Sequence, residues 1–172
     1  MTADLGELLS SFQHSAFRLE TLDRYTIPGE EAWLEAFRCD GSIPDLTPET
    51  YPWLKLVADA TAAGRVVQRI HIVGQPPSEY VRWELGMYRL LAAAGEDIRI
   101  ADRIRHPELG DLGPDFWLFD GAIAVVMRYD PEGRYLGAEV ADDVAPYLAQ
   151  RGLALSRSVS LAAFHATTSG MR

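Results

Sequence analysis

The sequence is poor in cysteine and in positive charge. Cys39 is the single cysteine among 172 residues, so no internal disulfide can form and we expect a reducing, cytoplasmic compartment. Lysine and arginine number 16 against 25 acidic residues, which gives a formal net charge of −9. This balance argues against a broad electrostatic contact with nucleic acid or with an anionic membrane.

Long hydrophobic runs are also missing. No stretch approaches the roughly 18 consecutive apolar residues that a bilayer-spanning helix requires. Residues 1–7 lack the basic and apolar regions of a signal peptide. We therefore expect neither a membrane span nor a membrane partner.

Familiar catalytic and metal-binding motifs are absent as well. The chain contains no Gly-rich phosphate loop, no Gly-x-Ser-x-Gly, no His-Glu-x-x-His and no Cys-x-x-Cys. Its four histidines have no metal-ligand spacing: His14, His71, His106 and His165. We expect no metal, no cofactor and no assigned catalytic residue, and a non-catalytic protein is favoured over an unfamiliar enzyme.

What is present indicates one folded domain. Hydrophobic residues make up 48% of the chain and charged residues 24%, as in ordinary globular proteins. A chain of 172 residues can bury a sufficient core without disulfides or metals. We expect a single domain over residues 1–172, with its core at about 12–150 and a C-terminal tail that frays at 167–172.

The strongest local signal lies in residues 116–140. Asp120-Gly121 separates two apolar runs, which is typical of a type I′ hairpin because both central residues need a positive φ. A second turn at 130–133 leads into a third run at 134–140. These segments predict a C-terminal antiparallel meander.

Apolar spacing and the positions of Pro, Gly and Ser place the other elements. They predict strands at 17–22, 65–73 and 98–101, and helices at 5–15, 28–38, from Pro48 or Pro52 to Gly64, 79–94, 142–150 and 161–164. Strand–helix–strand order followed by a meander predicts an α/β or α+β fold, with helices packed on a mixed sheet of about five strands.

The predicted helix at 79–94 carries the best candidate for a polar site. Tyr80, Glu84, Tyr88 and Leu91 share one helical face. A glutamate between two tyrosines can accept their hydroxyl protons, which indicates a polar pocket or a general base. A helix–sheet interface with one satisfied polar cluster, or a solvated glutamate, explains the pattern more simply. On the same helix, Arg82 can pair with a neighbouring carboxylate or meet an anion.

Two further patterns could belong to a ligand site. Arg69 and His71 project from the same side of the predicted strand at 65–73, where they could bind a phosphate or carboxylate. Solvation of an edge strand explains that pair just as simply. Trp117 lies in a predicted interior strand, where it could stack on an aromatic ligand, although core packing is the simpler use.

Seven segments carry a family resemblance: residues 17–21, 25–28, 78–84, 94–99, 115–120, 127–130 and 133–139. Together they resemble an uncharacterised actinobacterial family, catalogued as a domain of unknown function, over about residues 12–142. The resemblance implies regulatory or accessory work, because members of that family are typically encoded beside helix-turn-helix regulators. It carries over no catalytic residue. The chain also resembles a phospholipase D-type fold, without the His-x-Lys-x-x-x-x-Asp signature of active members.

The residues that match the family motifs form either a shared site or a shared scaffold: Tyr80, Arg82, Glu84, Glu96, Arg99, Asp115, Trp117 and Asp120. Our first hypothesis is a non-catalytic, cytoplasmic accessory protein that binds a protein partner, such as a helix-turn-helix regulator. The alternative is a small-molecule binder or unrecognised enzyme, with a polar pocket around Tyr80, Arg82 and Glu84. Direct DNA binding is disfavoured, because the only dense basic cluster is Arg99, Arg103 and Arg105. The candidate ligand-binding residues are Arg69, His71, Tyr80, Arg82, Glu84, Tyr88, Arg99, Asp115, Trp117 and Asp120.

Overall fold

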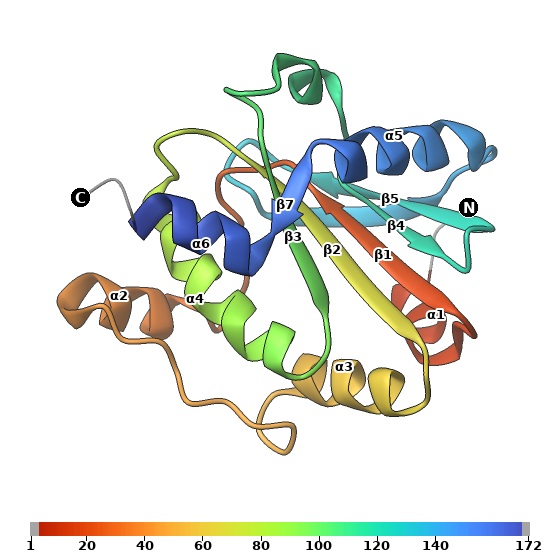
Figure 1. Cartoon of the computed structure of the whole chain (residues 1–172). Helices are drawn as coiled ribbons and strands as arrows, with labels where there is room; N and C mark the ends of the chain where they lie inside the picture. Colours follow the sequence, from red (N-terminus) through yellow and green to blue (C-terminus); the bar gives the residue numbers. More distant parts are fainter. Residues whose placement is uncertain (1–3, 170–172) are drawn as a thin grey trace.

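The computed structural model describes residues 4–169 and shows a seven-stranded mixed sheet with helices on both faces (Figure 1). The strands are β1 (Ser15–Glu20), β2 (Val66–Val73), β3 (Asp97–Asp102), β4 (Phe116–Phe119), β5 (Ile123–Tyr129), β6 (Tyr135–Val140) and β7 (Ser158–Ser160). The helices are α1 (Leu5–Ser11), α2 (Glu31–Asp40), α3 (Pro52–Ala62), α4 (Glu79–Ala93), the 3-10 helix η1 (Pro107–Asp111), α5 (Ala145–Ser156) and α6 (Leu161–Ser169).

The strand order is β6-β5-β4-β1-β2-β3-β7. Strands β1, β2 and β3 are parallel neighbours. Each connection between them crosses over through helices, as parallel pairing requires. All other neighbouring strands are antiparallel. The predicted α/β arrangement of a mixed sheet with a C-terminal meander is confirmed.

Local interactions set the β4–β5 turn and the two ends of α4. Asp120 and Gly121 have φ angles of 54° and 65°, as a type I′ turn between β4 and β5 requires. Ser78 caps α4, because its hydroxyl accepts a hydrogen bond from the Val81 N–H at 3.0 Å. Gly95 follows α4 with a φ of 111°, and a Cβ there would lie 2.5 Å from the Thr61 hydroxyl. Only glycine satisfies both the backbone conformation and that close approach.

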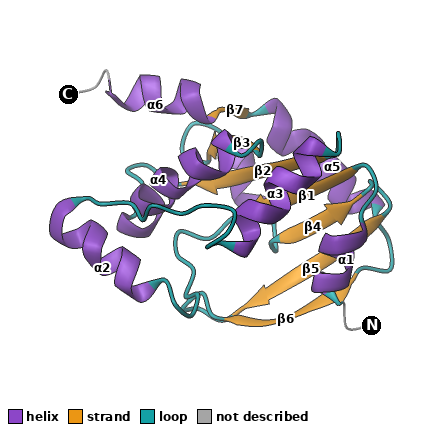
Figure 2. Cartoon of the chain, turned by 90° about the horizontal axis from the view of Figure 1, so that it is seen from below, coloured by secondary structure: helices purple, strands orange, loops and turns teal. Residues whose placement is uncertain are grey.

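The two sheet faces differ in chemistry. One face is entirely apolar at its centre, where Phe17, Ile70 and Leu118 pack with α5 and η1. The opposite face packs against α1 and α3 at one end and against α4 and α6 at the other. Figure 2 views this second face, with α1 and α3 in front of the strands. Between these two apolar regions the second face carries buried charges, and this is where the candidate site lies.

The C-terminal region departs most from expectation. The sheet has seven strands instead of about five, and β7 pairs with β3 through Ala101 and Ser158. A three-residue strand is too short to show periodicity, so sequence could not reveal it. α6 continues to Ser169, so the tail expected to fray from residue 167 begins inside a helix. The rest of that expected tail, residues 170–172, lies outside the described residues.

Within residues 4–169, no helix combines the length and the apolar character that crossing a membrane requires.

Candidate functional site

A buried polar cluster lies where β1 and β2 run side by side. Arg18 is opposite Arg69, and Glu20 is opposite His71. All four side chains project from the same face, because side chains alternate along a strand. They are between 0% and 9% exposed, which is rare for charged groups unless each has a partner.

Glu20 is the centre of the charge pairing. Its Oε1 accepts hydrogen bonds from Arg69 Nη1 at 2.8 Å and from Arg18 Nε at 3.4 Å. Burial opposes ionisation, but the two guanidinium groups outweigh it and lower the pKa of Glu20 to about 2. Arg69 also donates from Nε to Glu96 at 2.8 Å. Both arginines are therefore held by carboxylates of the chain itself.

Asp115 closes the other side of the cluster. Its carboxylate accepts bonds from Arg18 Nη2 at 3.0 Å, the Tyr25 hydroxyl at 2.5 Å, and the Thr21 N–H and hydroxyl at 2.9 and 2.7 Å. Four donors saturate a carboxylate. Asp115 therefore belongs to the scaffold that holds the loop after β1 against the sheet.

The hydrogen bonds of His71 define its protonation. Its Nε2 lies 2.8 Å from the Leu22 carbonyl oxygen, which can only accept, so Nε2 carries a proton. Its Nδ1 lies 2.9 Å from the Tyr88 hydroxyl, which donates its single proton to Glu20 at 2.8 Å. Nδ1 must then donate, and the ring is an imidazolium. Burial lowers the pKa of His71, but the carboxylates of Glu84 and Glu20 outweigh burial and raise it to about 9.

Glu20, His71 and Glu84 place one ligand-type atom each within 4.8 Å of one another, a grouping that a metal ion could occupy. The Tyr88 hydroxyl, however, lies between His71 Nδ1 and Glu20 and bonds both. In this structure the tyrosine hydroxyl therefore bridges Glu20 and His71, and Glu84 contacts His71 Nδ1 as an ion pair at 3.2 Å. The spacing of the histidines along the sequence could not have indicated this grouping.

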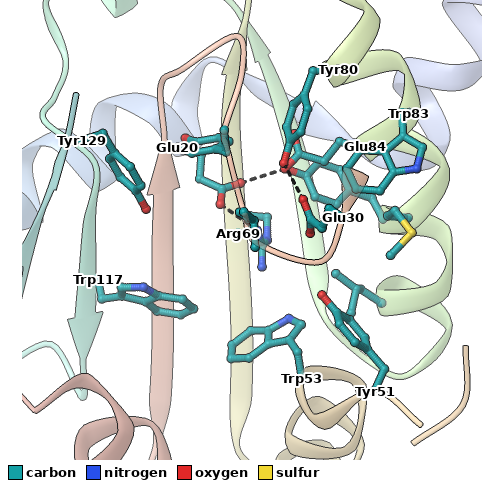
Figure 3. A pocket seen from close by; sticks show the side chains of 15 residues that line it. Glu20, Glu30, Tyr51, Trp53, Arg69, Tyr80, Trp83, Glu84, Trp117 and Tyr129 are labelled. Carbon is teal, nitrogen blue, oxygen red and sulfur yellow. Dashed lines mark hydrogen bonds and ion pairs between the residues drawn. The ribbon is translucent and has the colours of Figure 1, made fainter. Parts of the chain in front are cut away.

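A cavity of about 170 Å³ opens above the network, between α3, α4, the sheet and the loop that precedes α2 (Figure 3). We call it the aromatic pocket, because eight of its fifteen lining residues are tyrosine or tryptophan. The rings of Trp53 and Trp117 meet edge to face, with centroids 5.5 Å apart. Trp53 donates from Nε1 to Glu96 at 3.2 Å, which fixes the orientation of its ring.

Two carboxylates that line the pocket are incompletely bonded. Glu84 is 8% exposed, and its Oε2 lies 3.2 Å from His71 Nδ1 but accepts no hydrogen bond from any described residue. Burial raises the pKa of Glu84, and the charge of His71 only partly opposes that rise. Glu30 accepts one hydrogen bond, from the Tyr80 hydroxyl at 3.1 Å. Burial raises the pKa of Glu30 to about 7.

Seven of the ten residues predicted from sequence come together here: Arg69, His71, Tyr80, Glu84, Tyr88, Asp115 and Trp117. Three lie elsewhere. Arg82 is exposed and donates to the Pro77 carbonyl at 3.1 Å. Arg99 donates to the Ser158 hydroxyl at 2.8 Å and ties β3 to β7. Asp120 accepts backbone N–H bonds from residues 13–15 and stabilises the start of β1.

Two interpretations of the sequence were wrong in detail. Glu84 does not accept the tyrosine hydroxyls, because Tyr80 donates to Glu30 and Tyr88 donates to Glu20. Strand β2 is interior, between β1 and β3, so solvation of an edge strand does not explain Arg69 and His71.

Several site residues were not predicted: Arg18, Glu20, Tyr25, Glu30, Tyr51, Trp53 and Tyr129. One signal was available for the first two. Arg18 and Glu20 are two positions apart in an alternating strand, as Arg69 and His71 are in theirs. Each pair therefore lies on one face of its strand. The aromatic residues come from the loop after β1, from the start of α3 and from β5, so no local pattern could reveal them.

We expect Glu30→Gln to flatten the dependence of stability on pH between about 4.5 and 7. The pKa of Glu30 is raised to about 7 from 4.5, so the folded state binds its proton more tightly than the unfolded chain does. Its contribution therefore falls as pH rises through that window. Tyr80, Glu84, Glu20 and Glu31 are the titratable groups that act on it.

The measurement is the melting temperature at pH 5 and pH 8. The difference between these two temperatures should shrink in Glu30→Gln and stay unchanged in Glu7→Gln, which alters an exposed glutamate of α1. An unchanged difference in Glu30→Gln would contradict the raised pKa.

The chain matches a known protein family. The model of the family described as domain of unknown function (DUF6879) matches residues 3–166, nearly the whole chain. No curated protein matches the chain. The matched region contains every strand and every residue of the aromatic pocket. The chain therefore belongs to the DUF6879 family.

Proposed function

We propose that this protein binds a small molecule in the aromatic pocket. The observation that carries the proposal is Glu84, a buried carboxylate that lines a cavity and has an oxygen without a hydrogen-bond donor. A buried carboxylate with unmet hydrogen bonds destabilises a fold. Its presence here is therefore better explained by a role in binding than by a role in stability. Perturbed carboxylates in a concave pocket are typical of binding and catalytic sites.

The rest of the cluster serves as the frame of this site. Glu20 and Asp115 each have several donors, and Arg69 is held between Glu20 and Glu96. These carboxylates need no ligand, although Arg18 Nη1 and Trp83 Nε1 are also buried without an acceptor among the described residues. Glu84 differs from these carboxylates, because its Oε2 pairs with His71 at 3.2 Å but accepts no aligned hydrogen bond, and its place in the cavity lining supports a ligand beside it.

The size of the pocket limits the ligand. About 170 Å³ is close to the roughly 150 Å³ of an engineered protein cavity that holds benzene. A compact ligand, or the end group of a longer one, fits this volume. The pocket opens beside Ile27, which is 46% exposed, so a ligand can enter from solvent.

The lining supports binding more than covalent catalysis. Of the described residues, those that line the pocket include no serine, threonine, cysteine or lysine; the nucleophile types present are glutamate and tyrosine. Glu84 could act as a general base, as the sequence suggested, once a ligand places a proton within its reach.

The test uses three probes of equal shape and different charge: choline, its neutral carbon isostere 3,3-dimethyl-1-butanol, and 3,3-dimethylbutanoate. Binding is followed by ligand-observed NMR. We expect at least one probe to bind the wild-type protein and to bind Ile27→Trp at least tenfold more weakly, because the new ring covers the pocket entrance. Ile104→Trp is the matched control, since Ile104 is 64% exposed and does not line the pocket.

The proposal is wrong if Ile27→Trp binds the probes as the wild type does. It is also wrong if no probe binds and native mass spectrometry of protein purified gently from its own host shows no bound small molecule.

We also propose, as a second candidate, that this protein docks on a basic, DNA-binding regulator in the cytoplasm. The net charge of −9 supports this, because an acidic surface complements a basic one. Resemblance to an actinobacterial family encoded beside helix-turn-helix regulators supports it as well. The outer strand β6 also exposes Tyr135 and Leu136, at 53% and 67%. Calorimetry with the cognate regulator should show binding at tens of micromolar, and no heat at that concentration would reject this candidate.

A phospholipase D-type fold stays a prediction from the sequence alone.

A further inference from the structure

The aromatic pocket also carries information about the charge of its ligand, and this inference rests on the function proposed above. We infer that the ligand is a compact organic cation, such as a quaternary or tertiary ammonium group, held between the aromatic rings and the carboxylates of Glu30 and Glu84. Figure 3 shows the arrangement, with Trp117, Trp53 and Tyr51 along one side of the cavity and the carboxylates across from them.

The charges in and directly beneath the pocket do not balance. Three cations lie in or directly beneath the pocket: Arg18, Arg69 and His71. Five carboxylates oppose them: Glu20, Glu30, Glu84, Glu96 and Asp115. With every group ionised, two negative charges are in excess; burial raises the pKa of Glu30 and that of Glu84, so bound protons offset part of this excess in the free protein. A bound cation reduces that excess in a region largely shielded from water.

The carboxylates differ in whether donors of the chain already occupy their oxygens. Glu20, Glu96 and Asp115 point their oxygens at arginine, tyrosine and tryptophan donors of the chain. Glu84 and Glu30 retain unoccupied acceptor positions, and both line the cavity. The excess negative charge is therefore carried by Glu30 and Glu84 at the cavity wall, although Glu84 also pairs with His71 of the network at 3.2 Å.

Aromatic rings of the pocket already stabilise cations of the chain itself. The guanidinium carbon of Arg18 lies 5.6 Å from the centre of the Trp117 ring, and that of Arg69 lies 5.3 Å from the Tyr88 ring. Aromatic faces attract cations, and tryptophan does so best. The rings that stabilise these two internal cations also line the cavity, so they present the same kind of surface to a ligand.

An anion or a neutral ligand fits less well. An anion could approach only Arg69 among the cations that line the cavity, and Arg69 is bonded to Glu20 and Glu96 while three glutamates would repel the ligand. A neutral apolar ligand would leave Glu84 with His71 as its ion-pair partner and with no hydrogen-bond donor on that oxygen. A cation is attracted by the glutamates and adds a positive charge beside Glu84.

The experiment compares choline with 3,3-dimethyl-1-butanol, which has the same shape without the charge, by isothermal titration calorimetry. We expect choline to bind at least tenfold more tightly than the isostere. Glu84→Gln should reduce that preference to less than threefold, because it removes the charge and preserves the shape. Glu79→Gln is the matched control on α4, since Glu79 is exposed and pairs with Arg38 outside the pocket.

The outcomes separate the cationic character of the ligand from the proposed binding of a small molecule. Equal or tighter binding of the isostere, or preferential binding of 3,3-dimethylbutanoate, overturns the cation and leaves the pocket as a binding site. Failure of all three probes overturns the cation, and the proposed function then depends on the mass measurement described above. If Glu84→Gln does not fold, Glu30→Gln replaces it, because Glu30 is only half-buried and is expected to tolerate the change.

Discussion

Replacing Glu20 with alanine should lower the free energy of unfolding by on the order of 3–5 kcal/mol, the usual cost of breaking a buried ion pair on one side. The substitution removes the shared partner of Arg18 and Arg69, which are 3% and 9% exposed. It also removes the acceptor of the Tyr88 hydroxyl. Such a loss is a large fraction of the roughly 5–15 kcal/mol that stabilises a typical domain.

Urea denaturation followed by circular dichroism measures this effect. The matched control is Glu139→Ala, which removes a carboxylate paired with Arg128 at 3.2 Å on the surface, where both side chains are more than half exposed. Exposed pairs contribute little, so the control should unfold at nearly the wild-type urea concentration. Similar midpoints for the two variants would show that the buried network does not hold the sheet and α4 together.

The second large effect is a fall in stability at alkaline pH. His71 has a pKa of about 9 in the folded protein against 6.5 for a free side chain, so the folded state binds its proton more tightly. This contribution is fully present below about pH 6.5 and is lost as pH rises through 9. A difference of that size corresponds to on the order of 3 kcal/mol.

Urea denaturation at pH 6 and at pH 9.5 tests this expectation. The groups that face His71 are Glu20 from β1, Glu84 and Tyr88 from α4, and Tyr25 from the loop after β1. The wild type should lose most of the His71 contribution between the two pH values, whereas His71→Gln should lose little. His14→Gln, which replaces an exposed histidine, should behave as the wild type does. A wild-type stability that is constant or rises over this range would contradict an imidazolium at position 71.

The elements that sequence predicted well are those whose causes are local. The β4–β5 hairpin depends on Asp120 and Gly121, which adopt positive φ within two residues of their strands. Helix α4 depends on the Ser78 cap at its start and on Gly95 just beyond its end. The apolar spacing of Tyr80, Tyr88 and Leu91 likewise identified the buried face of that helix, because 3.6 residues per turn bring such positions together.

The site could be predicted only in part, because its contacts join distant segments. Arg18 and Asp115 are 97 positions apart, and Glu20 and Arg69 are 49 apart. Sequence placed Arg69 and His71 on one side of a strand but could not say which strand would lie next to it. Once β1 pairs with β2, the register sets Glu20 beside His71. The Glu20 carboxylate then accounts for the burial of the positive charges of both Arg69 and His71.

The sequence by itself determined the class of fold, the meander, the principal helix and the absence of familiar catalytic motifs, since each follows from residues close together in the chain. The tertiary structure alone decided that two arginines and a histidine would be neutralised internally, that Glu84 and Glu30 would face a cavity, and that rings from five separate segments would surround it. The physical reason is that the charge state and hydrogen bonding of a buried group depend on its spatial neighbours. Those neighbours are set by strand register and helix packing over the whole chain.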